Sequence, residues 1–252
     1  MAKDRYAWLF NGERFEDVRI LDAATGAGGM TQKLARRAGG STRIVSVDID
    51  QDTRVLDSLQ SSLQTPLTFI EDDLHQLQSV PDAAFDVVVC DDTLAFLSMP
   101  PLRTLSAIDT FHRVLKDGGR LLISAESPDE SRHPTGEWRR WQLAKAVFAL
   151  KGEAFYEPIH RNDLTRALAR SGFHVEASQS FPGGMMKDFE PLIEEWEAIL
   201  LHEIVHLPWG EGLKKTLHNT VVALSRSIRA DGYLDTPDTF AVKAVKRGGR
   251  NV

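Results

Sequence analysis

Continuous apolar runs alternate with segments of helical periodicity along the first half of the chain. The runs are predicted strands, because a strand that is covered on both faces needs no polar alternation. They span residues 19–21, 43–47, 67–70, 85–90 and 120–124. Apolar side chains recur at helical spacing between these runs, at residues 30–38, 53–63 and 101–115. The alternation predicts an α/β fold, a mostly parallel sheet with helices on both faces.

The second half of the chain is less regular. Helices are predicted at residues 136–150 and 163–171, and a sixth strand at 173–180. About 55 residues then separate this strand from a final one at 239–245, and they contain two helical stretches, at 189–206 and 212–230. We therefore expect a seven-stranded sheet and three segments. These are a core over 1–181, a helical insertion or lid over 182–236, and the last strand with a basic tail over 237–252.

Composition limits the setting and the partners. Apolar residues make up 42% of the chain and charged residues 26%, which is typical of a folded globular protein. The net charge of −6 disfavours a general binder of nucleic acid or of a membrane surface. The single cysteine, Cys90, excludes an internal disulfide and a cysteine-based zinc site. Because the sequence has neither an apolar run of roughly 18 residues nor a signal-peptide pattern, we expect a cytoplasmic location.

The turn after the first predicted strand, residues 22–29, is rich in glycine. Glycines there let the backbone approach a ligand, and the start of a helix favours negative charge. The dinucleotide pattern G-x-G-x-x-G does not fit, because Ala24 or Thr31 occupies a glycine position in either alignment. Asp22 would repel phosphates, so it suits a ligand that carries an amino group.

Asp22-x-Ala24-x-Gly26-x-Gly28 resembles the first motif of class I S-adenosylmethionine-dependent methyltransferases (type 11-like), with Ala24 in place of the first glycine. Further segments resemble the later motifs of this family in the same order, at residues 45–49, 69–74, 85–90, 113–121 and 170–173. The resemblance implies a Rossmann-like fold and S-adenosylmethionine as the cofactor. It also implies a site across the carboxyl ends of the first two strands.

The resemblance further implies a role for each motif. Asp48, at the end of the second strand, would accept hydrogen bonds from both ribose hydroxyls. Asp73 would reach the adenine amino group, with Asp72 as the competing assignment. Residues just after the fourth strand usually face the methyl group in this family, and Cys90 is the first of them. We expect its side chain to be buried and apolar and not to act as a nucleophile. The predicted cofactor-binding residues are Asp22, Ala24, Gly26, Gly28, Asp48, Ile49, Asp73, Leu74 and Cys90.

The expected reaction is an in-line attack on the sulfonium methyl group by a small, partly apolar acceptor. The N/D-P-P-Y signature of many N-methylating members is absent after the fourth strand, which lowers the case for nucleic acid as a substrate. Asp91 there is a candidate base, substrate anchor or metal ligand, although Asp91 or Asp92 could instead cap the next helix. His133 and His160, in connecting segments, are further candidate bases, but such histidines are more often simply exposed.

His202-Glu203-Ile204-Val205-His206 matches H-E-x-x-H, the zinc signature of metallopeptidases. On a helix both histidines lie on one face, within reach of one metal ion. The longer pattern fails, because Trp209 stands at its glycine position and Gly212 at its last histidine position. A divalent metal at His202 and His206 therefore remains an alternative, alone or within a methyltransferase, as does a protein that binds the cofactor without catalysis.

Two segments have no settled role. Strands six and seven of this family normally form a short hairpin, so the 182–236 insertion is expected to cover the acceptor pocket or to form a homodimer interface. Residues 6–10 are expected either to fold over the cofactor or to pack as a surface helix on the sheet edge.

Overall fold

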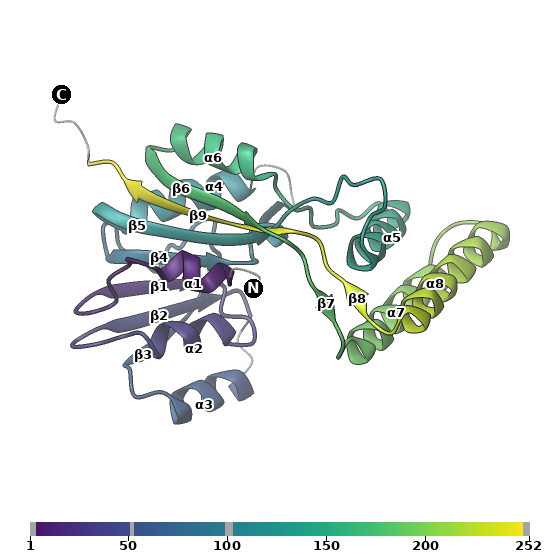
Figure 1. The fold of residues 1–252 in the computed structure, drawn as a ribbon, viewed down its shortest axis with the longest axis horizontal. Coiled ribbons are helices and arrows are strands. Elements are labelled where there is room, and N and C mark those ends of the chain that lie inside the picture. The colour runs from purple at the N-terminus through teal and green to yellow at the C-terminus, as the bar shows by residue number, and fades with distance from the viewer. Residues whose placement is uncertain (1–3, 51–52, 99–102, 249–252) are drawn as a thin grey trace. The chain divides into compact units, whose positions relative to one another are not determined.

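The computed structural model describes residues 4–50, 53–98 and 103–248, and within them it contains a seven-stranded sheet (Figure 1). The strands follow one another along the sheet in the order β3-β2-β1-β4-β5-β9-β6. Their bounds are β1 Arg19–Ala23, β2 Arg43–Asp48, β3 Leu67–Glu71, β4 Phe85–Asp91, β5 Leu115–Glu126, β6 Phe173–Phe181 and β9 Thr239–Lys246. The predicted seven-stranded α/β sheet is confirmed.

The strand order reverses beside β1. β2 and β3 follow one another on one side of β1, whereas β4 and β5 lie on its other side, and all these neighbours pair in parallel. β9 runs opposite to β6 (Figure 1). The carboxyl ends of β1, β2 and β4 therefore meet at one edge, at the point where an open α/β sheet places its ligands.

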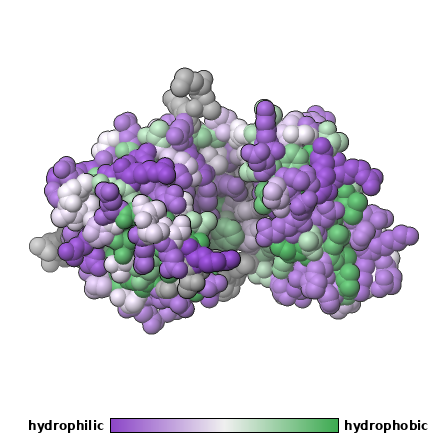
Figure 2. All heavy atoms as spheres, turned by 90° about the horizontal axis from the view of Figure 1, so that it is seen from below, coloured by the Kyte–Doolittle hydropathy of each residue, from purple (hydrophilic) through white to green (hydrophobic). Residues whose placement is uncertain are grey.

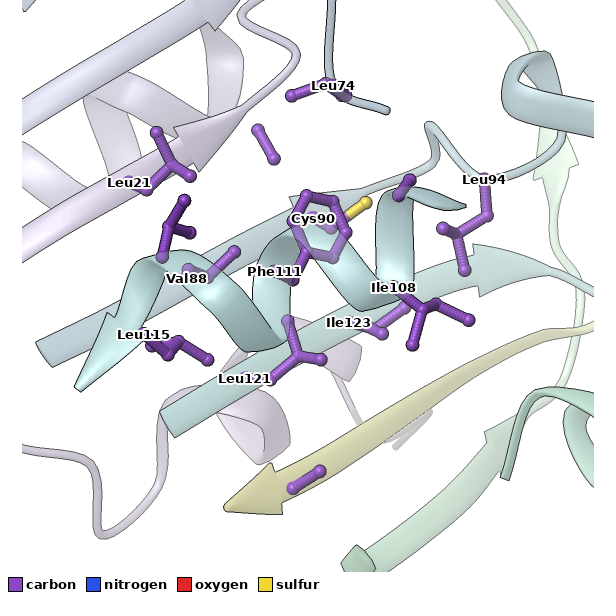
Figure 3. Close-up of a cluster of buried hydrophobic side chains, with 14 of the residues drawn as sticks. Leu21, Leu74, Val88, Cys90, Leu94, Ile108, Phe111, Leu115, Leu121 and Ile123 are labelled. Carbon is purple, nitrogen blue, oxygen red and sulfur yellow. The ribbon is translucent and has the colours of Figure 1, made fainter. Parts of the chain in front are cut away.

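Helices pack on both faces of this sheet. They are α1 Arg5–Phe10, α2 Gly29–Ala35, α3 Thr53–Ser62, α4 Arg103–Val114 and α6 Arg161–Arg170, with the short 3₁₀ helix η1 at Phe96–Ser98. Successive residues of β4 alternate between two apolar clusters: Val88 and Cys90 belong to one, Val87 and Val89 to the other. Figure 3 shows the first cluster, where Phe111 of α4 packs over the strands. Burial on both faces explains the continuous apolar runs.

A second compact unit comprises residues 127–157 and 182–239. Its helices are α5 Gly136–Lys151, α7 Glu190–Val205 and α8 Glu211–Asp231, and its two short strands, β7 Met185–Met186 and β8 Leu234–Asp235, pair antiparallel. Val147, Trp196 and Val221 pack together among these helices. The sequence analysis grouped residues 127–157 with segment 1–181, whereas their contacts are with α7 and α8, because α5 buries its apolar side chains there.

The surface mixes polar and apolar groups. In the space-filling view of Figure 2, hydrophilic residues cover much of the visible face, and hydrophobic residues gather in patches between them. Among the residues that the structure describes, no helix combines the length and the apolar character that a membrane crossing requires.

Candidate functional site

A cavity of about 520 Å³ opens at the carboxyl edge of the sheet, within the unit that contains β1 to β5. Its wall is built from the turn after β1, the ends of β2 and β4, the loop after β3, one side of α2, and η1. The volume lies in the range of small-molecule sites in proteins.

The turn after β1 follows a left-handed path. Ala24, Gly26 and Gly28 have φ angles of +70°, +47° and +79°, in the region that favours glycine. A Cβ atom on Gly28 would lie 2.8 Å from a methyl group of Leu59 in α3, whereas one on Gly26 would meet nothing within 4 Å. Gly28 therefore allows close packing and Gly26 leaves open space at the cavity. Ala24 keeps the conformation at a cost of roughly 1–2 kcal/mol relative to an unstrained backbone.

Asp48, the last residue of β2, faces this turn and lines the cavity. Its Oδ2 accepts a 2.8 Å hydrogen bond from the backbone N–H of Gly26, and its Oδ1 accepts one of 2.8 Å from that of Ile49. Each carboxylate oxygen keeps a further acceptor site. Asp48 is thus held in place and can still accept hydrogen bonds from a diol. Ile49 also lines the cavity and is 68% exposed.

Asp22 lies behind the turn and is absent from the cavity wall. Its side chain is 1% exposed, and its Oδ2 accepts hydrogen bonds from the hydroxyls of Thr31 at 2.5 Å and Ser46 at 3.2 Å. Its Oδ1 is buried without a partner. Burial raises the pKa of Asp22 to about 7. In this structure the side chain joins β1, α2 and β2 instead of facing the cavity.

Cys90 is also absent from the cavity wall, so its contact with a ligand stays a prediction. The residue is fully buried in the apolar cluster on the α4 side of the sheet (Figure 3). Burial raises the pKa of its thiol well above the usual range. The expectation of a buried, non-nucleophilic cysteine agrees with this position.

The loop after β3 separates the two candidate acids. Asp72 turns into its own loop, where it accepts hydrogen bonds from the backbone N–H groups of Asp73 at 2.7 Å and Ser79 at 2.9 Å. Burial acts to raise the pKa of Asp72, but the hydrogen bonds from Ser79 and Asp73 outweigh it and lower the pKa. Asp73 lines the cavity together with Leu74 and His75. The geometry therefore favours Asp73 over Asp72.

Two residues that the sequence analysis did not single out hold this part of the site. His75 lines the cavity with its Nδ1 2.5 Å from Asp73 Oδ1. Arg113 of α4 donates hydrogen bonds of 2.9 Å to the carbonyls of Gln76, Leu77 and Val80, and so fixes the loop that follows. The Arg113 position lies within the predicted motif at 113–121, which could have indicated this structural role.

Asp91 and Asp92, at the end of β4, both line the cavity and are held by α1. Asp91 accepts hydrogen bonds from the hydroxyl of Tyr6 at 3.0 Å and from that of Ser124. Asp92 pairs with the Arg5 guanidinium through both of its oxygens. Burial, together with the charge of Asp91, raises the pKa of Tyr6 to about 12, so its phenol stays protonated and donates to Asp91.

These contacts bear on two questions that the sequence left open. The first is whether Asp91 or Asp92 caps a helix, and the second is whether residues 6–10 fold over the cofactor or pack on the sheet edge. The carboxylates of Asp91 and Asp92 bind the side chains of α1 and β5, so a helix cap is not needed to explain them. α1 itself has two sides: Arg5 and Tyr6 contact the acids on the cavity wall, whereas Leu9 and Phe10 are buried in an apolar cluster on the sheet.

The two histidines proposed as bases lie elsewhere. His160 is exposed at the start of α6 and is absent from the cavity wall, so its role as a base stays a prediction. His133 is exposed in the segment before α5 and belongs to the second unit, so its role as a base stays a prediction. Of the three candidates, Asp91 is the one on the cavity wall.

The H-E-x-x-H segment lies on α7. The rings of His202 and His206 are 4.4 Å apart, and Nδ1 of His206 lies 2.8 Å from the His202 carbonyl oxygen. Glu203 forms a 2.6 Å ion pair with Lys151 of α5. Across residues 4–50, 53–98 and 103–248, no three His, Cys, Asp or Glu side chains are grouped so that they could hold a metal ion. The motif therefore joins two helices here, and a metal at His202 and His206 finds no support.

Known proteins resemble this chain over the same region. Residues 20–119 match a family model described as a methyltransferase domain. The ubiquinone/menaquinone biosynthesis C-methyltransferase of Stutzerimonas stutzeri is 34% identical over 108 residues, which cover 42% of this chain and 40% of that protein. The match thus spans about two fifths of the relative's length.

Solved structures share the fold over nearly the whole chain. An S-adenosylmethionine-dependent methyltransferase from Methanosarcina mazei superposes with a TM-score of 0.60 at 16% identity, covering 98% of this chain and 100% of that one. The (4+2)-cyclase SpnF has the same TM-score at 18% identity, covering 96% and 79% of the two chains. At these identities the likeness concerns the fold alone.

Proposed function

We propose that this chain is a class I S-adenosylmethionine-dependent methyltransferase, which transfers the methyl group of S-adenosylmethionine to a small, partly apolar acceptor. The match of residues 20–119 to a methyltransferase domain and the 34% identity to a C-methyltransferase over 108 residues support this family. The observation that carries the proposal is the convergence of Asp48, Asp73 and Asp91 on one cavity beside the glycine turn. These acids come from the ends of three different strands or the loops after them.

The residues around the cavity fit this cofactor. Asp48 would accept hydrogen bonds from the ribose hydroxyls and Asp73 from the adenine amino group. Ile49 and Leu74 offer apolar surface to the adenine ring, and the open space at Gly26 leaves room for the ligand. When bound, the cofactor supplies an electrophilic methyl group on a positively charged sulfur.

The chain's own residues would orient the acceptor and exclude water. Asp91 has its carboxylate fixed by the hydroxyls of Tyr6 and Ser124. It would accept a proton from an acidic acceptor group, or anchor a donor group of the acceptor. Tyr6 would act as a hydrogen-bond donor and not as a base, because its raised pKa keeps the phenol protonated.

An acceptor with an apolar ring fits the opposite wall. Met30, Phe96 and Leu97 line the cavity, and Phe96 is 54% exposed. The matched relatives are named for C-methylation in ubiquinone and menaquinone biosynthesis, so we propose aromatic ring compounds as the first acceptors to test. The 182–236 segment remains a proposed lid or homodimer interface.

Calorimetric titration with S-adenosylmethionine and S-adenosylhomocysteine tests the cofactor, with NADH as a control ligand. We expect one site per chain for both adenosyl ligands and no binding of NADH. Transfer of a labelled methyl group to a panel of aromatic acceptors then tests the reaction. Failure of both adenosyl ligands to bind would overturn the proposal. Binding without transfer to any acceptor would favour a non-catalytic protein or another reaction, as the fold of the (4+2)-cyclase illustrates.

The choice between Asp73 and Asp72 gives a prediction of its own. Asp73→Ala should weaken S-adenosylhomocysteine binding about 10-fold, because a charged hydrogen-bond acceptor is worth roughly 1.5 kcal/mol or more. It should leave S-inosylhomocysteine, which lacks the adenine amino group, unaffected. The matched variant Asp72→Ala should keep the preference for the adenine ligand. Calorimetry on both variants with both ligands checks this, and a lost preference in Asp72→Ala instead would exchange the two roles.

A further inference from the structure

Lys33 is a cation on the cavity wall that forms no direct ion pair with a carboxylate of the described residues, although its charge is close enough to act on the carboxylate of Asp92. It belongs to α2, is half-buried and lines the cavity. Its Nζ lies 3.4 Å from the carbonyl oxygen of Gly29 and 4.6 Å from the centre of the Tyr6 ring. Within the part of the chain that the structure describes, Lys33 forms no ion pair with an Asp or Glu.

Two neighbouring arginines differ from Lys33 in this respect. Arg5 is matched by the carboxylates of Asp92 and, at 3.8 Å, Asp91. Arg103, which also lines the cavity, lies 4.0 Å from Asp73. Their charges are thus balanced by the protein. Lys33 has no such direct ion pair in the described part of the chain, so its half-buried charge still attracts an anion that enters the cavity.

Tyr6 connects this cation to the acids at the end of β4. Its ring face contacts Nζ of Lys33, while its hydroxyl donates a 3.0 Å hydrogen bond to Asp91. One tyrosine therefore touches a positive group and a negative group on the same wall. An α-amino acid group, which carries a carboxylate and an ammonium on one carbon, is complementary to such a pair.

We propose that Lys33 binds the carboxylate at the amino-acid end of S-adenosylmethionine. This inference rests on the proposed function. It adds the residue that binds the carboxylate, which is the one anionic group of the cofactor. Tyr6 is then a positioning residue, because it holds the ammonium of Lys33 against its ring. Asp91 and Asp92 carry two negative charges against the one positive charge of Arg5, so the end of β4 still attracts the ammonium of the same amino-acid group.

The test compares ligands that differ by this carboxylate alone. S-Adenosylmethionine carries the group, and decarboxylated S-adenosylmethionine lacks it but keeps the ammonium and the sulfonium. The variant is Lys33→Met, which removes the charge and keeps an unbranched side chain that is one atom shorter. The matched control is Arg36→Met, which removes an exposed positive charge at the end of the same helix, away from the cavity.

Calorimetric dissociation constants for both ligands give the result. Lys33→Met should weaken S-adenosylmethionine binding about 10- to 100-fold, the range of a charge-assisted hydrogen bond. Binding of the decarboxylated ligand should stay within twofold. Arg36→Met should leave both constants within twofold, and Lys33→Arg should retain the preference for the carboxylate.

Equal losses for both ligands, or none for either, would overturn the assignment of Lys33. If Lys33→Met does not fold, judged by circular dichroism, Lys33→Gln takes its place with the same expected pattern. The failure of the proposed function has a different signature, because the unaltered protein would then bind neither S-adenosylmethionine nor S-adenosylhomocysteine.

Discussion

Asp48→Ala is expected to weaken the binding of S-adenosylhomocysteine by about 100-fold or more. The substitution removes a carboxylate that would accept two hydrogen bonds from the ribose, and each charged hydrogen bond is worth roughly 1.5–3 kcal/mol. It also removes the 2.8 Å hydrogen bond from the Gly26 N–H, so the glycine turn loses its anchor to β2. Isothermal titration calorimetry measures the change directly.

Glu71→Ala supplies the matched control for Asp48. Glu71 ends the neighbouring strand in register with Asp48, but it is exposed and absent from the cavity wall. Its substitution should leave the dissociation constant within twofold. A second comparison uses 2′-deoxy ligands, for which Asp48→Ala should cost less than for the ribose form. An Asp48→Ala variant that binds S-adenosylhomocysteine within threefold of the original protein would mean that the ribose lies elsewhere.

The sheet was predictable from the sequence because its physical cause is local. Strands covered on both faces have to be apolar at every position, and β4 shows this with Val87 and Val89 on one face and Val88 and Cys90 on the other. The acids at this edge were placed through the family resemblance instead. Asp48 and Asp73 occupy the motif positions at the end of β2 and in the loop after β3.

The contacts of α1 could not be read from the sequence. Arg5 meets Asp92 across 87 positions of the chain, and no local pattern links a six-residue helix to the end of β4. The packing of α5 against α7 and α8 could not be read from the sequence either. The apolar residues of α5 do not gather on one face of the helix, so their pattern does not indicate which elements they contact. The position of Lys33 was partly predictable. It stands four residues after Gly29, so both lie on one side of α2, but the sequence does not show that Lys33 forms no ion pair with the residues that the structure describes.

Short motifs did not determine the contacts of their side chains. The H-E-x-x-H spacing brings His202 and His206 together, as helical geometry requires, but Glu203 pairs with Lys151 from another helix. Asp22 stands where the family's first motif has its acid, yet its side chain turns behind the glycine turn. A motif fixes the backbone position of a residue, and the neighbours decide which way the side chain turns.

The buried carboxyl of Asp22 should make the stability of the protein fall as the pH rises from about 4 to about 7. An aspartate in the unfolded chain loses its proton near pH 4, whereas burial raises the folded pKa to about 7. Between these values the folded state holds more protons than the unfolded state, so the free energy of unfolding decreases with pH and levels off above the folded pKa. At about 1.4 kcal/mol per pKa unit, the change amounts to about 4 kcal/mol.

Asp22→Asn removes this titration and keeps the shape of the side chain, so its free energy of unfolding should change less between pH 4.5 and pH 8. Urea unfolding at both values, without added ligand, measures the difference between the two proteins. Asp57→Asn, on the exposed side of α3, should leave the pH dependence as it is. Parallel curves for the original protein and Asp22→Asn would mean that the carboxyl finds a counter-charge or water in solution. That partner would contact Oδ1, the carboxyl oxygen that accepts no hydrogen bond from a described residue, whereas Oδ2 already accepts from Thr31 and Ser46.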